Sequence, residues 1–241
     1  MNHEDVSDSM IKRVKLEAPE GHPSLRYQIQ IVDESLLDEA MNFMGKYFSN
    51  NNLRNSLVAD LKDKKFENVE GTIWKEILSE GISLAAILED DQGNKGRIIC
   101  CYALGIVKKG DKFDLNSPER DIPKGSRCII QTVEDVTAKA DVFKAFDCDE
   151  YIDGCGLATA TDFQRRGVAG EVMRACPEVC KLTGTPVCAA VFTAEASQKL
   201  AFRCGYKTLA ELDLTTYRID DRIIYPNPEC PVIKFMAIRY F

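Results

Sequence analysis

The chain has 241 residues, of which 45% are apolar and 29% are charged, and its formal net charge is −7. These values are typical of one ordinary globular domain. No apolar run is long enough for a membrane span or a signal peptide, so we expect a cytoplasmic protein with no membrane partner. The acidic balance argues against nucleic acid as a partner, because phosphate binding needs a clustered basic face.

The first half of the chain begins with a polar, acidic segment over residues 1–25, which we interpret as a tail before a single domain over 26–241. Alternating apolar residues predict strands, and apolar residues at intervals of three to four predict helices. These patterns predict a strand at 26–32, a helix at 36–48, helices at 55–62 and 72–79, strands at 82–89 and 97–108, a surface loop at 109–127 and a helix at 129–143. Thr72 is expected to cap its helix and Gly81 to end it.

The second half of the chain alternates between strand and helix patterns. They predict a strand at 151–160, a helix at 167–182, a strand at 186–192, a helix at 197–204 and strands at 207–213 and 232–238. Pro177 falls inside the longest of these helices and removes one hydrogen bond, so we expect a bend or an altered turn there. The order predicts one α/β domain whose mixed sheet is mainly antiparallel early and has a parallel crossover late.

Ten cysteines are spread along the chain without CxxC spacing. We therefore expect reduced, mostly buried thiols and no disulfide framework. Cys176 and Cys180 share one face of a predicted helix and have the spacing of a ligand pair. No second pair or histidine completes a zinc site, so packing in the core is favoured and no metal is expected.

One short motif, Gln164-Arg165-Arg166-Gly167-Val168-Ala169, fits the pattern Q/R-x-x-G-x-G/A between a predicted strand and the helix that follows it. Free backbone N–H groups at a helix start bind pyrophosphate, and small residues keep side chains out of the way of the phosphates. The two arginines add charge at the rim. The alternative is an ordinary turn between strand and helix with a tight glycine.

This motif resembles the phosphate-binding turn of the GNAT acetyltransferases, which holds the pyrophosphate of acetyl-CoA. The segment SQKLAFRCGY at 197–206 resembles a helix ending of the same family. The segments VFKAFDCDEYIDGCGL, FQRRGVAGEVMR and ECPVIKFMAIRYF are similar to those of insect arylalkylamine N-acetyltransferases, and this resemblance spans residues 25–241.

The resemblance implies a GNAT fold with a central mixed, mostly antiparallel sheet flanked by helices. It also implies acetyl-CoA as cosubstrate and a small primary amine, either an arylalkylamine or a polyamine, as acceptor, with a monomer favoured. The residues implied to bind the coenzyme are Leu157, Ala158, Thr159, Gln164, Arg165, Arg166, Gly167, Val168, Ala169 and Gly170.

Acetyl transfer to an amine of pKa about 10 requires removal of a proton before nitrogen attacks the thioester. The family's relay glutamate corresponds here to Asn51, whose carboxamide cannot act as a base. Thr193 and Ser197 match hydroxyl positions of the family and are the candidate catalytic residues. Ser197 is equally suited to cap a helix, and Glu195 between them is interpreted as a solvated loop acid. Both histidines lie in the tail segment, which favours direct transfer over an acyl-enzyme.

Two further positions depart from the family pattern. Ala201 stands where many GNATs have a tyrosine acid, and Cys230 stands where the family often has histidine. Acids near the start of a predicted strand would suit a polyamine acceptor, namely Asp147, Asp149, Glu150 and Asp153. The alternative function is a protein that binds acyl-CoA in this fold with little or no turnover.

Overall fold

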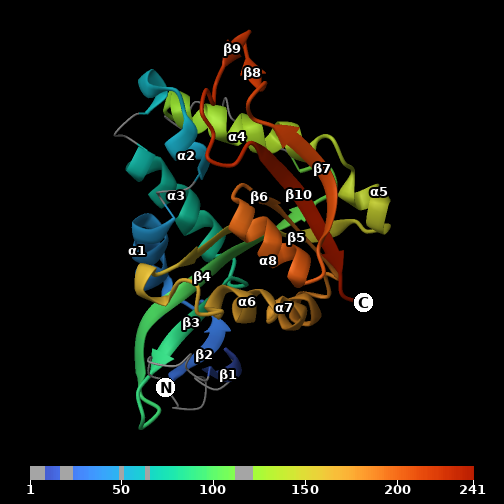
Figure 1. Cartoon of the computed structure of the whole chain (residues 1–241). Coiled ribbons are helices and arrows are strands. Elements are labelled where there is room, and N and C mark those ends of the chain that lie inside the picture. The colour runs from blue at the N-terminus through green and yellow to red at the C-terminus, as the bar shows by residue number, and fades with distance from the viewer. Residues whose placement is uncertain (1–8, 17–23, 49–51, 63–65, 112–121) are drawn as a thin grey trace.

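The protein is described from a computed structural model over residues 9–16, 24–48, 52–62, 66–111 and 122–241. A single eight-stranded sheet in the order β1-β2-β3-β4-β5-β6-β10-β7 runs through the molecule, with helices on both of its faces (Figure 1). Every neighbouring pair of strands is antiparallel except β5 and β6. The mixed, mostly antiparallel sheet predicted from the sequence is therefore confirmed.

The strands are β1 (Met10–Leu16), β2 (Leu25–Ile31), β3 (Leu84–Glu89), β4 (Lys95–Lys108), β5 (Glu150–Thr159), β6 (Val187–Phe192), β7 (Lys207–Asp213) and β10 (Val232–Arg239), with a separate hairpin of β8 (Arg218–Ile219) and β9 (Arg222–Ile223). The α-helices are α1 (Leu37–Tyr47), α2 (Asn52–Ser56), α3 (Phe66–Leu78), α4 (Lys124–Thr137), α5 (Val142–Phe146), α6 (Val168–Met173), α7 (Cys176–Thr183) and α8 (Glu195–Arg203). Two short 3-10 helices are η1 (Ala59–Leu61) and η2 (Thr161–Phe163).

Strand β6 shows how the two faces of the sheet are covered, because successive side chains of a strand point to opposite faces. Val187 and Ala189 belong to a core cluster with residues of α4 and the C-terminal strands. Cys188 and Ala190 belong to the other cluster, with residues of α6 and α7. Helices α4 and α7 thus lie on opposite faces of the sheet.

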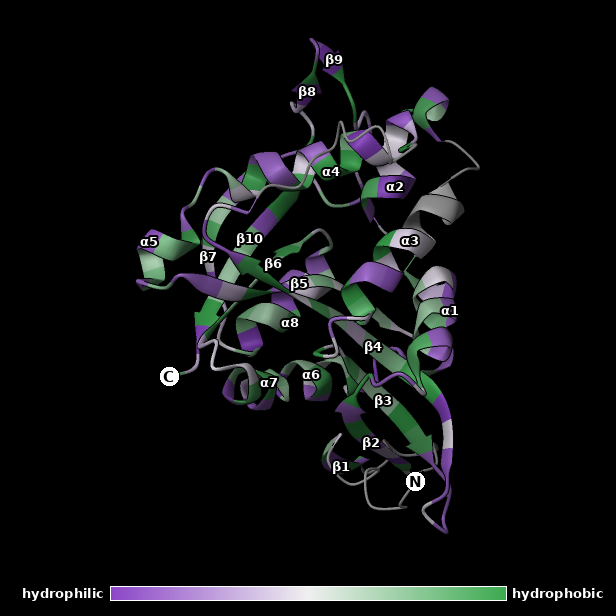
Figure 2. Cartoon of the chain, turned by 180° about the vertical axis from the view of Figure 1, so that it is seen from behind, coloured by the Kyte–Doolittle hydropathy of each residue, from purple (hydrophilic) through white to green (hydrophobic). Residues whose placement is uncertain are grey.

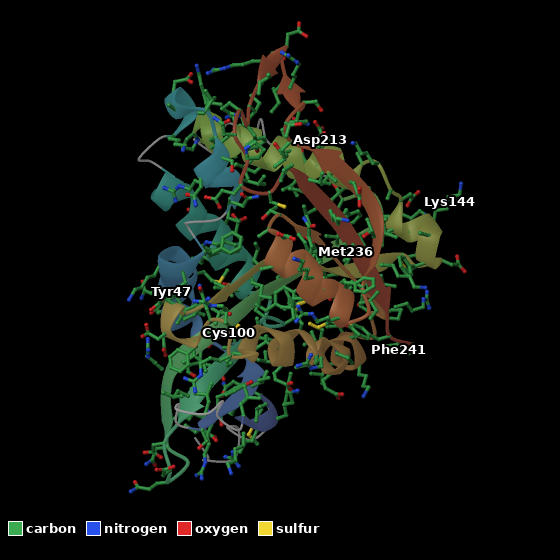
Figure 3. The ribbon with its side chains drawn as sticks, viewed as in Figure 1. Tyr47, Cys100, Lys144, Asp213, Met236 and Phe241 are labelled. Atoms are coloured by element: carbon green, nitrogen blue, oxygen red, sulfur yellow. The ribbon has the colours of Figure 1, made fainter. Side chains whose placement is uncertain are left out.

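Apolar residues are concentrated along the central strands, which Figure 2 shows in green on β3 and β4. Cys100 is fully buried and Met236 is 2% exposed, and both lie inside the body of the molecule in Figure 3. Lys144 extends outward from α5 in the same view. Among the described residues, no helix combines the length and the apolar character needed to cross a bilayer.

The first strand was not predicted, because Met10–Leu16 lies inside the segment interpreted as a tail. It pairs antiparallel with β2 along the edge of the sheet. Ile11, Val14 and Leu16 pack against the core, although the residues around them are charged. The strand pattern was missed because the first 25 residues are polar on average, whereas an edge strand needs apolar residues on one face only.

Three predicted helices have different bounds. The helix expected at 55–62 is instead α2 followed by η1. Thr72 is not a cap, because α3 begins at Phe66, whereas Gly81 has a φ of +69° just beyond the end of that helix. The helix expected at 129–143 ends at Thr137, and α5 starts separately because the Asp141 side chain accepts a hydrogen bond from the Lys144 N–H and caps it.

The altered turn predicted at Pro177 is present, but it lies just before the proline. The long helix expected at 167–182 is divided into α6 and α7, and the division falls at Arg174 and Ala175. Pro177 lies in the first turn of α7, where a missing N–H costs no helical hydrogen bond.

Candidate active site

The two parallel strands at the centre of the sheet pair over only two positions, Ile152 with Cys188 and Asp153 with Ala189. Beyond Asp153, β5 continues to Thr159 in pairing with β4 alone. One backbone edge of β5 is therefore open toward β6. We call this region, bounded by residues 154–159 of β5 and 190–192 of β6, the β5–β6 opening.

The backbone of β5 is oriented for binding an extended ligand in this opening. Ala160 donates its N–H to the carbonyl of Ile99 at 2.9 Å, so it faces β4. Because backbone groups alternate along a strand, Ala158 also faces β4, and Leu157 and Thr159 turn their N–H and carbonyl groups to the opening. The resemblance implied a coenzyme contact at 157–159, and Leu157 and Thr159 are the two whose backbone groups have the geometry for it.

Two glycines next to the opening are required by close packing. A Cβ atom on Gly154 would overlap the Tyr102 hydroxyl and lie 2.9 Å from the Ala190 Cβ. A Cβ atom on Gly156 would lie 2.8 Å from the Trp74 ring and 3.0 Å from Phe48. Between these glycines, Cys155 is the extra residue of a β-bulge, since Ala103 pairs with Gly156 while the next residue of β4 pairs with Gly154.

The predicted phosphate-binding turn follows β5 and η2 and leads directly into α6. Arg165 and Gly167 both have positive φ, at +59° and +83°. A Cβ atom on Gly167 would meet only Leu16, at 3.9 Å, so the glycine is needed for its backbone conformation and not for space. Gln164 is exposed, and its side chain donates to the Thr159 carbonyl at 3.3 Å.

The backbone donors of this turn precede the helical hydrogen-bond ladder. Glu171 donates its N–H to the Gly167 carbonyl at 3.2 Å, which begins the ladder of α6. The N–H groups of Val168, Ala169 and Gly170 come before it, where a helix has no internal acceptors for them. Such donors, reinforced by the helix dipole, are suited to an anion.

Several cations surround the turn. The guanidinium groups of Arg166 and Arg97 lie 5.7 and 5.2 Å from the centre of the Phe163 ring. Lys12 of β1 forms an ion pair with Glu171 at 2.8 Å and so joins the N-terminal strand to α6. The turn therefore lies in a locally basic part of an acidic protein.

The predicted catalytic residues have different surroundings. The Ser197 hydroxyl donates to the Ala194 carbonyl at 2.8 Å and accepts from the Ala194 N–H at 3.4 Å, as a capping residue does. Glu195 is exposed and pairs with Lys199 at 2.6 Å. Thr193 is half-buried at the end of β6, and its carbonyl accepts a hydrogen bond from the Asn52 side chain. Asn51 and the two histidines lie outside the described residues.

Two amide side chains near Thr193, of which Asn52 is buried and Gln198 is half-buried, were missed by sequence reasoning. Asn52 is 7% exposed, and its side-chain oxygen accepts from the Ser56 hydroxyl at 3.3 Å. Gln198 donates to the Val232 carbonyl at 2.7 Å and lies 3.5 Å from the Cys230 sulfur. No local pattern marks these amides, because their partners are far away in sequence.

The acids proposed for a polyamine acceptor do not form one cluster. Asp147 and Asp149 are exposed before the start of β5, at the end of the strand away from the phosphate-binding turn. Glu150 accepts a hydrogen bond from the Thr185 hydroxyl at 2.9 Å. Asp153 alone lies at the β5–β6 opening.

The cysteines predicted to pack in the core, Cys176 and Cys180, are fully buried, and Cys180 lies 3.5 Å from the sulfur of Cys188. Within the described part of the chain, no three His, Cys, Asp or Glu residues are grouped as metal ligands.

Comparison with known proteins gives structural matches only. No protein-family model matches the sequence, and no curated protein matches it. Insect putative arylalkylamine N-acetyltransferase 7 from the yellow fever mosquito Aedes aegypti is 25% identical, with a TM-score of 0.83 over 97% of this chain and 95% of that one. Arylalkylamine N-acetyltransferase 2 from Aedes aegypti is 18% identical, with a TM-score of 0.75 over 89% and 99% of the two chains.

A third solved structure, the Drosophila melanogaster polyamine N-acetyltransferase, is 16% identical and has a TM-score of 0.68 over 88% of this chain and 98% of that one. These matches show that the chain has the fold of the GNAT acetyltransferases. The match to the first mosquito protein agrees with the expectation of an acyltransferase, and it supports acetyl transfer to an amine as the general chemistry.

Proposed function

We propose that this protein transfers the acetyl group of acetyl-CoA directly to a small primary amine. The observation that carries the proposal is the turn at 164–170, where the first N–H groups of α6 have no helical acceptor. This turn follows β5, and the backbone edge of β5 that is not paired with β6 extends from the turn back toward Asp153. A pyrophosphate on the turn and an extended arm along β5 together require this arrangement. The similarity in fold to the mosquito enzymes supports the same reaction class.

In the proposed reaction, Gly167 to Gly170 hold the diphosphate and the backbone of Leu157 pairs with the pantetheine arm. The amine nitrogen attacks the thioester carbonyl carbon, and the resulting oxyanion accepts a hydrogen bond from a backbone N–H of β5. Collapse of the intermediate breaks the C–S bond, and the departing sulfur takes the second proton of the nitrogen. The products are the N-acetylated amine and coenzyme A, with one proton released.

The acceptor is proposed to be an arylalkylamine. The half-buried ring of Phe48 and the buried ring of Trp74 pack edge to face over Gly156 with their centres 5.0 Å apart, so the side of the opening next to Gly156 is aromatic. A polyamine would want several carboxylates there, and the acids near the start of β5 are mostly exposed or engaged elsewhere.

Binding and turnover are tested separately. Saturating acetyl-CoA should raise the melting temperature of the full chain, because a ligand that binds only the folded state stabilises it. Release of free coenzyme A is then measured with tryptamine, spermidine and lysine as acceptors, and tryptamine should react fastest. Gly167→Glu should abolish coenzyme binding by placing a carboxylate in the phosphate position. Binding without turnover on any acceptor would favour the alternative of a coenzyme-binding protein.

A further inference from the structure

Asp153 occupies the position where β5 and β6 separate. Its backbone is in the last pair between the two strands, opposite Ala189. Cross-strand partners share a face of the sheet, and Ala189 lies on the face that α4 covers. Asp153 is thus at the closed end of the β5–β6 opening, on the face opposite to α7.

The surroundings of Asp153 contain acidic and neutral groups. The Cys155 thiol donates to the Asp153 carboxylate, with its sulfur 3.5 Å from Oδ2. The Glu80 carboxylate, which accepts from the Ile106 N–H at 2.9 Å, adds a second negative charge beyond the end of α3, and Tyr151 is the neighbouring titratable side chain on β5. Burial raises the pKa of Asp153 to about 6, and Glu80 adds to the rise while the thiol opposes it.

A carboxylate in these surroundings is suited to accept a proton. A base works best when its pKa is close to the operating pH, which ordinary surface acids do not reach. Glu195 is fully exposed and paired with Lys199, and Asp135 accepts hydrogen bonds from Tyr217 and Gln131. Asp153 instead has a weak thiol donor and lies at the opening itself.

The position also suits the direction from which each substrate arrives. The phosphate-binding turn follows the C-terminal end of β5, so an arm extended along the open edge runs back toward Asp153 and carries its thioester to the closed end. The acceptor would reach the thioester from the face where Phe48 and Trp74 pack on Gly156. An ammonium group next to that thioester would meet the Asp153 carboxylate.

We propose that the Asp153 carboxylate accepts the proton of the acceptor ammonium, directly or through one water, and so produces the neutral amine that attacks the thioester. This inference rests on the proposed acetyltransferase function. One N–H bond of the ammonium breaks and one O–H bond forms on Asp153, and the proton passes to solvent when the products leave. The proton acceptor therefore lies on β5 in this protein. In the related enzymes the corresponding glutamate is expected in the segment just after α1.

The test compares the wild type with Asp153→Asn, Asp153→Glu and the matched control Glu195→Gln in the full chain. We measure kcat/KM for tryptamine between pH 5 and 9, and the Kd for acetyl-CoA of each variant. The wild-type rate should fall below pH 6 with unit slope. D153N should lose this limb and at least about 100-fold in kcat/KM, since general base catalysis contributes that much. D153E should recover part of the rate, and E195Q should keep the wild-type profile.

The coenzyme measurement separates this inference from the proposed function. An unchanged Kd for acetyl-CoA in D153N, together with the lost rate, supports the role of Asp153. A D153N protein that keeps the rate and the acid limb overturns the inference and leaves the acetyltransferase function in place. If D153N does not fold, the wild-type profile decides, because a rate that stays level from pH 8 down to pH 5 excludes a base that titrates near 6.

Discussion

The side-chain amide of Asn52 in α2 donates a hydrogen bond to the backbone carbonyl of Thr193 at the end of β6. The two residues are 141 positions apart, and the bond fixes α2 against the side of the β5–β6 opening that β6 forms. The Asn52 oxygen is itself held by Ser56, whose hydroxyl accepts from the Glu229 N–H at 3.3 Å. One buried amide thus joins three segments beside the proposed acceptor site.

Asn52→Ala should lower the free energy of unfolding by about 1–3 kcal/mol, because it leaves the carbonyl of the half-buried Thr193 without its donor. It should also raise KM for the amine more than it changes the Kd for acetyl-CoA, since α2 lies on the acceptor side. Urea unfolding and steady-state kinetics check both effects. Asn94→Ala, in the exposed turn between β3 and β4, serves as a control for loss of an amide whose partners are near in sequence. If N52A changed KM for the amine and the Kd for acetyl-CoA by equal factors, the placement of α2 on the acceptor side would be contradicted.

Gly167→Ala should weaken acetyl-CoA binding about tenfold or more. The φ of +83° at this position strains any residue with a Cβ atom, at a cost of about 1 kcal/mol or more, and the strain is relieved by turning the backbone donors away. Gly93→Ala is the matched control, because Gly93 has a φ of +82° and open space around it in a turn far from the site. Both variants should lose similar stability, whereas only G167A should bind the coenzyme less tightly, as measured by calorimetry.

Gly154→Ala should destabilise the protein by about 1–3 kcal/mol, because the new methyl group would overlap the Tyr102 hydroxyl and press on Ala190. The strands would have to separate further at the closed end of the opening. Gly45→Ala in α1 meets no atom within 4 Å and should instead stabilise its helix by up to about 1 kcal/mol. Thermal denaturation of the two variants gives opposite signs if the packing around Gly154 is as described.

The pH dependence of stability gives an independent measure of the Asp153 environment. Its pKa is about 6 in the folded protein, above the ordinary value of 3.8, so the native state binds the proton more tightly than the unfolded chain. Its stabilising contribution is present below pH 3.8 and is lost as the pH rises through 6. The melting temperature of D153N minus that of the wild type should therefore increase between pH 4 and pH 7.

Asp213→Asn should behave in the opposite way. Hydrogen bonds from the Thr215 hydroxyl and N–H lower the pKa of the Asp213 carboxyl, so its contribution is present above the ordinary pKa and is lost as the pH falls. The melting temperature of D213N minus that of the wild type should become more negative as the pH rises from about 2 to about 5, and it should change little between pH 5 and pH 7. Parallel curves for D153N and D213N would show that Asp153 is not held in an unfavourable environment.

The amino-acid sequence by itself determined most of the elements and the phosphate-binding turn. The alternating and helical patterns, the glycine at 167 and the proline at 177 act within a few residues, so each leaves a readable local signal. The same reasoning missed β1, because three apolar residues among charged ones suffice for an edge strand, and it placed helix ends wrongly where Asp141 acts as a cap.

The tertiary structure alone decided which residues meet at the candidate site. Asp153 was one of four acids near the start of a strand, and only the register between β5 and β6 sets it at the point where they part. Asn52 and Thr193 come together because α2 packs beside the end of β6, and Ser197 bonds back to Ala194 because α8 begins at Glu195. Contacts between distant segments depend on the order and register in which the strands of the sheet pair, and no short stretch of sequence contains that information.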